Sequence, residues 1–239
     1  MKSSGVTCII PLYNESLNVT HVLSRIVKLP FITQLICVDD GSTDDSALKI
    51  STHFPQVELV RLPQNMGKSY AVKSGLAYAK YDTIMLIDAD MQNIVVSEIK
   101  TAFKLYDSHQ ADMLILGWKS DNAFFRAMRG DIIISGGRFL KKRDLEKVFE
   151  IFKFQRYALE VAINRYMIGH KKTTCWFQTS AHNTFQTEKY GFIRGWKSAF
   201  EEGYSVMSSS QFGIVDQFFN FRPKKLMAEI AEIEDEVIN

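Results

Sequence analysis

Short apolar runs alternate with longer amphipathic stretches through the first half of the chain. The apolar runs have the length and composition of buried strands, and they lie at residues 6–10, 34–38, 57–61, 83–87 and 112–116. Apolar residues at helical spacing fill the stretches between them, at residues 16–29, 44–53, 67–80 and 96–108. Strands and helices that alternate in this way predict an α/β fold, in which helices flank a mostly parallel sheet.

The second half of the chain follows a less regular pattern. Residues 130–137 contain three glycines and predict a flexible turn. Helical spacing predicts helices over 143–152 and 155–168, and a strand or a pair of strands is expected within 172–186. A basic loop at 187–197 follows, and a tail begins near residue 205.

The tail contains an apolar pattern with two interpretations. Its members follow helical spacing before two lysines, Lys224 and Lys225, and they are Phe212, Val215, Phe218, Phe219 and Arg222. In one interpretation residues 211–225 form a helix that lies on a membrane surface with its aromatic side down. In the other, the same helix covers the core. The acidic end of the chain is expected to be a solvated helix.

Composition narrows the class of protein. The chain has 239 residues, 46% hydrophobic and 23% charged, with a net charge of +2, which suits a globular protein and gives no electrostatic argument for nucleic acid as a partner. Cys8 and Cys37 lie in apolar runs, as buried thiols do, and no cysteine spacing suggests a metal site. The start of the chain lacks the apolar core of a signal peptide, and no run reaches the roughly 20 residues of a spanning helix. We expect a cytoplasmic protein, with peripheral contact to a membrane left open.

Polar residues gather where the predicted strands end. Four consecutive strands are followed by hydrogen-bonding or charged groups, at residues 11–15, 39–44, 64–68 and 88–92. In open parallel sheets the ligand site lies beyond the carboxyl ends of the strands. These four segments therefore predict one continuous polar rim, which is the strongest functional feature of the sequence.

Asp88, Asp90 and Gln92 offer three oxygen ligands at alternating positions after a buried strand. Two carboxylates this close repel each other unless a cation lies between them. Mg2+ and Mn2+ prefer carboxylate, amide and water oxygens, so a divalent cation site is expected here. The alternative is that Asp88 caps the next helix while Asp90 is solvated.

Two further parts of the rim have their own candidates. Asp39 and Asp40 precede a glycine and a helix cap, and two adjacent acids exceed what a cap needs, so one of them is a candidate partner for a nucleobase or a ribose. Gly67 and Lys68 open a helix, where a backbone can approach a phosphate closely and a lysine can neutralise it.

Taken together, these motifs resemble family 2 glycosyltransferases of the GT-A fold. They are Pro-Leu-Tyr-Asn-Glu at 11–15, Val-Asp-Asp-Gly-Ser-Thr-Asp at 38–44, Asn-x-Gly-Lys at 65–68 and Asp-Ala-Asp at 88–90, and the match covers residues 6–117. Asp-Ala-Asp-Met-Gln at 88–92 is most similar to the dolichol-phosphate mannose synthase branch. Lys119 stands where that branch has arginine, and Gln155-Arg156-Tyr157 stands where it has His-Arg-Phe.

The resemblance implies a role for each matching residue. The nucleotide-sugar would be bound by Pro11, Tyr13, Glu15, Asp39, Asp40, Lys68, Asp88, Ala89 and Asp90. Mg2+ or Mn2+ would be held by Asp88, Asp90 and Gln92. Catalysis would involve Asp90, Lys119 and Arg138, and acceptor phosphate would meet Lys119, Arg138, Arg156 and Lys189. The GT-A domain would span residues 1–203, with a nucleotide-sugar half at 1–117 and an acceptor half at 118–203, before a helical tail at 204–239.

The expected reaction is transfer of a hexose, with inversion, from a GDP- or UDP-sugar to a polyprenyl or dolichyl phosphate. Many family members that act on a sugar hydroxyl resemble each other in a later Glu-Asp base and a Gln-x-x-Arg-Trp motif, and this chain has neither. A hydroxyl acceptor needs a base, whereas a phosphate is already anionic at neutral pH. Glu160 is a candidate base, or else a partner of Arg156 or Lys153. Transfer to a sugar hydroxyl, an inactive nucleotide-sugar-binding homologue, a nucleotidyltransferase and a phosphoacceptor signalling domain are the alternatives.

Overall fold

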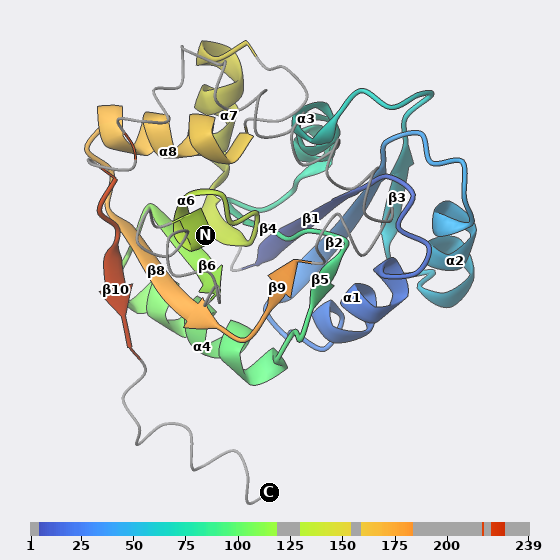
Figure 1. Cartoon of the computed structure of the whole chain (residues 1–239), viewed down its shortest axis with the longest axis horizontal. Coiled ribbons are helices and arrows are strands. Elements are labelled where there is room, and N and C mark those ends of the chain that lie inside the picture. The colour runs from blue at the N-terminus through green and yellow to red at the C-terminus, as the bar shows by residue number, and fades with distance from the viewer. Residues whose placement is uncertain (1–4, 119–129, 154–158, 184–216, 218–220, 228–239) are drawn as a thin grey trace, which may run out of the picture.

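The structure is a computed structural model, and it describes residues 5–118, 130–153, 159–183, 217 and 221–227 (Figure 1). The first half contains β1 (Val6–Leu12), α1 (Val19–Ile26), β2 (Ile32–Asp39), α2 (Ser46–His53), β3 (Glu58–Arg61), α3 (Lys68–Tyr78), β4 (Thr83–Leu86), β5 (Met91–Gln92), α4 (Val96–Ser108) and β6 (Met113–Trp118). The later elements are α6 (Gly130–Ile133), β7 (Arg138–Lys141), α7 (Lys142–Ile151), α8 (Leu159–Gly169), β8 (Thr174–Thr179), β9 (His182–Asn183) and β10 (Lys224–Leu226).

The main sheet has eight described strands in the order β10-β8-β6-β7-β4-β1-β2-β3. All neighbouring pairs run parallel except those made by β7, which is antiparallel to both β4 and β6. A separate pair of short antiparallel strands, β5 and β9, lies beside it. The mostly parallel α/β sheet expected from the sequence is confirmed.

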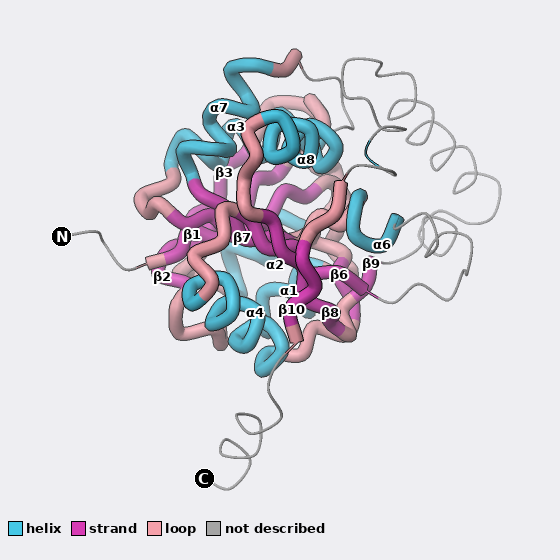
Figure 2. Tube along the Cα trace, turned by 90° about the vertical axis from the view of Figure 1, so that its left-hand side faces the viewer, coloured by secondary structure: helices cyan, strands magenta, loops and turns pink. Residues whose placement is uncertain are grey.

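Helices cover both faces of this sheet. In Figure 2, α1 and α4 lie below the strands, and α3, α7 and α8 lie above them. The two buried clusters of apolar side chains follow the alternation of each strand: in β1, Cys8 and Ile10 point to the side of α1 and α4, whereas Ile9 points to the side of α3 and α8. Because both faces are buried, the strands are continuous apolar runs rather than alternating ones.

Several expectations for the second half were incomplete. The strands β7 and β10 were not predicted, because each has few apolar residues and carries basic side chains. The segment expected to hold one strand or a pair forms β8 and β9, which pair with different partners. Residues 130–137, expected as a turn, begin with the short helix α6. The basic loop at 187–197 lies outside the described residues.

Only part of the tail is described. Phe221 is 2% exposed and packs into the core on the α8 side of the sheet, while Lys224–Leu226 adds a parallel strand beside β8. Lys225 places its Nζ 5.1 Å from the centre of the Trp176 ring. Most of the residues expected to contact a membrane, 211–216 and 218–220, lie outside the described part. None of the helices seen in the described ranges is both long and apolar enough to cross a bilayer.

The three cysteines are buried free thiols. Burial raises the pKa of Cys8 and raises the pKa of Cys37 to about 12, so both remain protonated at neutral pH. The expectation of buried thiols at these two positions is confirmed.

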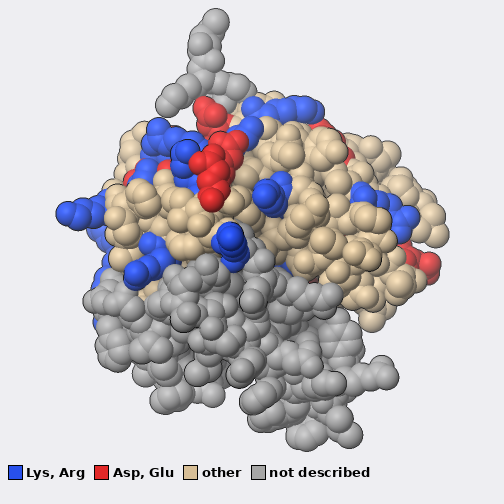
Figure 3. Space-filling model, turned by 90° about the horizontal axis from the view of Figure 1, so that it is seen from above, with Lys and Arg blue, Asp and Glu red and all other residues tan. Residues whose placement is uncertain are grey.

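The surface at the top of the molecule in Figure 1, seen from above in Figure 3, carries both basic and acidic side chains. Lys and Arg side chains lie on several sides of a small acidic group there (Figure 3). On α7 at least, such charges pair with one another, since Lys147 lies 2.6 Å from Glu150 and both are more than half exposed. Exposed pairs of this kind contribute less than about 1 kcal/mol to stability, so they do not mark a site.

Candidate functional site

The loops that follow β1 and β2 are bound to each other by hydrogen bonds. The Asn14 N–H donates to Ser42 Oγ at 2.9 Å, and the Thr43 N–H donates to Asn14 Oδ1 at 2.8 Å. The Glu15 N–H donates to Ser46 Oγ at 2.9 Å. Asn14 has a φ of 54°, a left-handed conformation that asparagine tolerates better than most residues. Two of the four predicted strand-end segments therefore form one joined structure.

Asp44 completes this junction. Its carboxylate accepts hydrogen bonds from the Ser16 N–H at 3.0 Å, the Ser46 N–H at 3.0 Å and Ser46 Oγ at 2.5 Å. Partial burial raises the pKa of Asp44, but these hydrogen bonds outweigh burial, and the net pKa lies below its usual value.

Asp39, the last residue of β2, is fully buried and has two partners. Its Oδ1 accepts from the Ser42 N–H at 2.8 Å, and its Oδ2 accepts from Arg61 Nε at 2.9 Å. Arg61 ends β3, the edge strand next to β2. This carboxylate therefore closes the turn after its own strand and ties that strand to β3.

Asp40 is 3% exposed and holds the loop that leads into α3. Its two oxygens accept from the Met66 N–H at 2.8 Å and the Gly67 N–H at 2.7 Å. Gly67 has a φ of 94°, which a residue with a side chain rarely adopts. The carboxylates of Asp39 and Asp40 are thus bound to protein groups, and a contact with a nucleotide stays a prediction for both.

Lys68 lies between two carboxylates that come from different parts of the chain. It begins α3, and its Nζ lies 2.5 Å from Oδ1 of Asp88, just after β4, and 2.6 Å from Oε1 of Glu160 in the first turn of α8. Burial alone would lower the pKa of Lys68, but the two carboxylates outweigh it and raise the pKa above its usual value. Lys68 is therefore a firmly charged ammonium group with two anionic partners.

The predicted metal ligands lie together beyond β4. Asp88 is 8% exposed, Asp90 is half-buried, and Gln92 lies in β5. Gln92 Nε2 donates to Asn18 Oδ1 at 3.1 Å, and Asn18 Nδ2 donates to Glu15 Oε2 at 2.8 Å. This chain of contacts fixes the orientation of the Gln92 amide and connects it to Glu15, another predicted site residue.

The donor set fits a hard divalent cation, because it consists of two carboxylates and an amide. Gly136 leaves room for the carboxylate of Asp88: a Cβ built at Gly136 would clash with Oδ2 of Asp88 and would lie 2.6 Å from its Oδ1. Within the described residues no three His, Cys, Asp or Glu side chains gather as a metal cluster. A cation bound here would therefore depend on Asp88 and Asp90 together with a neutral oxygen, and this site stays a prediction.

Arg138, predicted to face phosphate, begins β7 and is fully buried. Its Nη1 donates to Asn164 Oδ1 at 3.2 Å, and its Nη2 donates to the carbonyl of Ser135. Burial lowers the pKa of Arg138 to about 10, against the opposing charges of Glu160 and Asp88. Arg138 thus lies close enough to Glu160 and Asp88 to feel their charges and is bound to protein groups, and its contact with a phosphate stays a prediction.

Some of the remaining predicted residues lie at the rim, and the others lie outside the described residues. Pro11 lies in β1 and pairs with Val38 of β2. Tyr13 comes just after β1 and is 37% exposed, and Ala89 is buried between Asp88 and Asp90 in the sequence. Lys119, Arg156 and Lys189 lie outside the described residues.

Two residues at the site make contacts that the sequence did not predict. Glu160 was expected to pair with Arg156 or Lys153 or to act as a base, whereas the structure pairs it with Lys68. Gly136 was assigned only to a turn, although it packs against Asp88. The adjacent glycines Gly136 and Gly137 could have indicated a close approach of another group to the backbone. No feature of the sequence near Glu160 or Lys68 indicates that these two residues pair.

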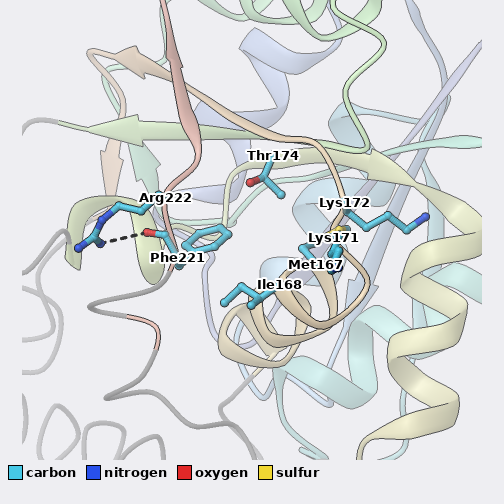
Figure 4. A pocket seen from close by; sticks show the side chains of 7 residues that line it. All are labelled: Met167, Ile168, Lys171, Lys172, Thr174, Phe221 and Arg222. Carbon is cyan, nitrogen blue, oxygen red and sulfur yellow. Dashed lines mark hydrogen bonds between the residues drawn. The ribbon is translucent and has the colours of Figure 1, made fainter.

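A separate hollow of about 220 Å3 lies at the other end of α8 (Figure 4). Lys171, Lys172 and Arg222 line it together with Met167, Ile168, Thr174 and Phe221. Thr174 begins β8, so this hollow lies at the amino end of a parallel strand, away from the carboxyl ends where the predicted residues gather. Lys172 is already paired with Asp144 at 2.9 Å.

The chain belongs to glycosyl transferase family 2, since the model of that family matches residues 7–193. This match extends the resemblance seen in the sequence beyond the nucleotide half.

Two curated relatives carry polyprenyl phosphates in their names. A dolichyl-phosphate beta-glucosyltransferase of Trichomonas vaginalis is 35% identical over 97 residues, which are 35% of this chain and 28% of that protein. An undecaprenyl-phosphate 4-deoxy-4-formamido-L-arabinose transferase of Sodalis glossinidius is 34% identical over 101 residues, 39% of this chain and 31% of that protein. The similarity thus spans about a third of the length of each relative.

Solved structures confirm the GT-A fold. The glucosyl-3-phosphoglycerate synthase of Mycobacterium tuberculosis, solved with Mn2+, UDP and phosphoglyceric acid, matches with a TM-score of 0.68 and 17% identity. The match covers 88% of this chain and 79% of that one.

Proposed function

We propose that this protein transfers a hexose from a GDP- or UDP-sugar to a polyprenyl phosphate, with Mg2+ or Mn2+ bound by Asp88, Asp90 and Gln92. One observation carries the proposal: Asp88, Asp90 and Gln92 follow the central strand β4 at its carboxyl end, where Asp88 contacts Lys68 and Gln92 is linked through Asn18 to Glu15. In open α/β sheets this is where ligands bind.

The residues of the chain have separate tasks in this proposal. Asp88 and Asp90 hold the cation, and the Gln92 amide, held in place by Asn18, supplies a neutral oxygen. The bound cation would neutralise the diphosphate of the donor as it leaves. The loops tied together by Asn14 and Asp40 shape the nucleotide side of the site.

The proposed acceptor rests on chemistry and on the names of relatives. A phosphate monoester is anionic at neutral pH and needs no base to attack the anomeric carbon. Glu160, the candidate base, is occupied by Lys68 at 2.6 Å. The two relatives described above are named for transfer involving dolichyl and undecaprenyl phosphate.

The first test measures donor binding by isothermal titration calorimetry with GDP- and UDP-sugars in Mn2+, Mg2+ or EDTA. We expect one sugar nucleotide to bind with a divalent cation and not with EDTA. Asp90→Ala is expected to weaken this binding at least about a hundredfold, because a carboxylate ligand is lost. Asp107→Ala, which removes an exposed acid of α4, is the matched control. Equal affinity in the Asp90 variant and the wild type would refute the cation site.

A second test addresses the acceptor. The protein is incubated with the radiolabelled donor and either a polyprenyl phosphate or an oligosaccharide, and the products are separated by solvent extraction. Label in the lipid fraction supports the proposal. Label only in the oligosaccharide would establish transfer to a hydroxyl instead.

A further inference from the structure

The ammonium group of Lys68 is paired with the carboxylate of Asp88, which is one of the proposed ligands of the divalent cation. Its Nζ lies 2.5 Å from Oδ1 of Asp88, in a partly buried position where the lysine side chain is 28% exposed and the aspartate side chain 11%. Two cations that share one carboxylate at this depth repel each other strongly. A cation can bind Asp88 well only if the ammonium group of Lys68 has somewhere else to go.

Glu160 provides that alternative partner. Its Oε1 lies 2.6 Å from the same Nζ, and it stands in the first turn of α8, where a carboxylate is favoured by the helix dipole. The backbone on both sides is fixed: Asp40 holds the Gly67 N–H before Lys68, and Leu159 and Val161, beside Glu160, are each 1% exposed. Only the side chain of Lys68 has to move.

We propose that Glu160 is a positioning residue that retains Lys68 when a cation takes Asp88, so that cation binding exchanges one partner of the ammonium group rather than stranding it. The inference rests on the cation site of the proposed function. In the absence of a cation, Lys68 bridges both acids and neutralises the cluster. With a cation at Asp88 and Asp90, the Lys68–Glu160 pair persists beside the cation site, and the lysine stays within reach of a donor diphosphate.

The arrangement makes opposite predictions for the two partners. In Glu160→Gln, Asp88 is the only remaining anionic partner of Lys68 in the bridge, so a cation has to break that contact and its affinity falls about tenfold. In Lys68→Met the competitor is gone, and the affinity rises. In the double variant, Glu160→Gln should have little further effect because there is no lysine to retain.

The experiment measures binding of Mn2+ alone, by electron paramagnetic resonance of the free ion, to the full chain and these three variants. Glu146→Gln on α7, an exposed acid with 47% side-chain exposure, is the control for loss of one charge. A tenfold loss in Glu160→Gln that disappears in the Lys68→Met background supports the proposal. The same loss in both backgrounds would overturn it, because it would show a general electrostatic effect rather than retention of Lys68.

Further outcomes separate this inference from the proposed function. Wild-type affinity in Glu160→Gln, with binding lost in Asp90→Ala, would refute the exchange and leave the cation site intact. Failure of the wild type to bind Mn2+ would refute both. If Glu160→Gln does not fold, Lys68→Met decides, because unchanged or weaker Mn2+ binding there contradicts the competition.

Discussion

The acids at the end of β2, Asp39 and Asp40, and the acids after β4, Asp88 and Asp90, are similar in sequence, but Asp88 is held differently from the first pair. Asp40 accepts hydrogen bonds from two backbone N–H groups, and Asp39 accepts one from a backbone N–H and one from Arg61. Asp88 instead faces the ammonium group of Lys68, on a long side chain shared with Glu160. Asp39, Asp40 and Asp88 are all buried, yet the first two accept mainly from the main chain, whereas Asp88 is paired with a movable side chain.

This difference separates a structural acid from one that can exchange partners. A backbone N–H cannot leave its carboxylate without opening the loop that contains it, and an unpaired buried N–H costs free energy. A lysine has several rotatable bonds and a second acid at 2.6 Å, so it can release Asp88 without becoming unpaired. We therefore expect substitutions after β2 to affect stability first and those after β4 to affect ligand binding first.

The largest expected effect tests the structural side of the comparison. Asp40→Ala leaves the N–H groups of Met66 and Gly67 without their acceptor in a buried loop, and we expect the free energy of unfolding to fall by about 3 kcal/mol. Urea denaturation followed by circular dichroism measures it. Asp90→Ala serves as the comparison, with a loss below about 1 kcal/mol. Equal losses in the two variants would remove the distinction between the strand ends.

The next prediction disturbs Asp88 without changing any charge. Gly136→Ala places a methyl group where the Asp88 carboxylate lies, so the carboxylate has to move. We expect Mn2+ affinity to fall about tenfold, since ligand positions matter at the ångström level. Gly169→Ala is a matched control, because a Cβ there meets no atom within 4 Å. Unchanged Mn2+ affinity in Gly136→Ala would show that the observed position of Asp88 is not the one that binds a cation.

Much of this comparison follows from local sequence, because strands, helices and turns are specified by neighbouring residues. The apolar runs located β1 to β4 and β6, and the polar residues after them located the rim at the carboxyl ends of the strands. The helix expected at 96–108 has those bounds in the structure. What the pattern could not show is which acids the protein itself neutralises, since Arg61 and Lys68 reach their acids from other strands and helices.

The second half was harder to predict for the same reason. Arg138 and Lys141 are the first and last residues of β7, a strand of four residues that pairs antiparallel with β4 and β6. Its stability therefore comes from neighbours far away in the sequence. An arginine at the first position of β7 is not a residue type that predicts a buried strand. Glu160 lies in an otherwise apolar helical pattern, and the sequence suggested partners close to it along the chain. Its partner is instead Lys68 of α3, which lies on the same face of the sheet as α8.

The smallest expected effect concerns Asp44, at the junction of the first two loops. Its pKa lies below its usual value because Ser16 and Ser46 donate hydrogen bonds to the charged form. Its stabilising contribution is therefore complete above the unfolded pKa of about 3.9 and is lost as the pH falls through the folded pKa. We expect Asp44→Asn to be less stable than the wild type by about 1 kcal/mol at pH 7, and the difference to shrink below about pH 4. Urea midpoints at pH 7, 5, 4 and 3 measure this difference. The control for loss of one charge is Asp45→Asn, because Asp45 is exposed and, although it stands at the N-cap position of α2, its side chain makes no capping hydrogen bond. A difference that stays constant down to pH 3 would mean that the two serines hold this side chain by its shape rather than its charge, and the junction after β1 and β2 would then be insensitive to acid.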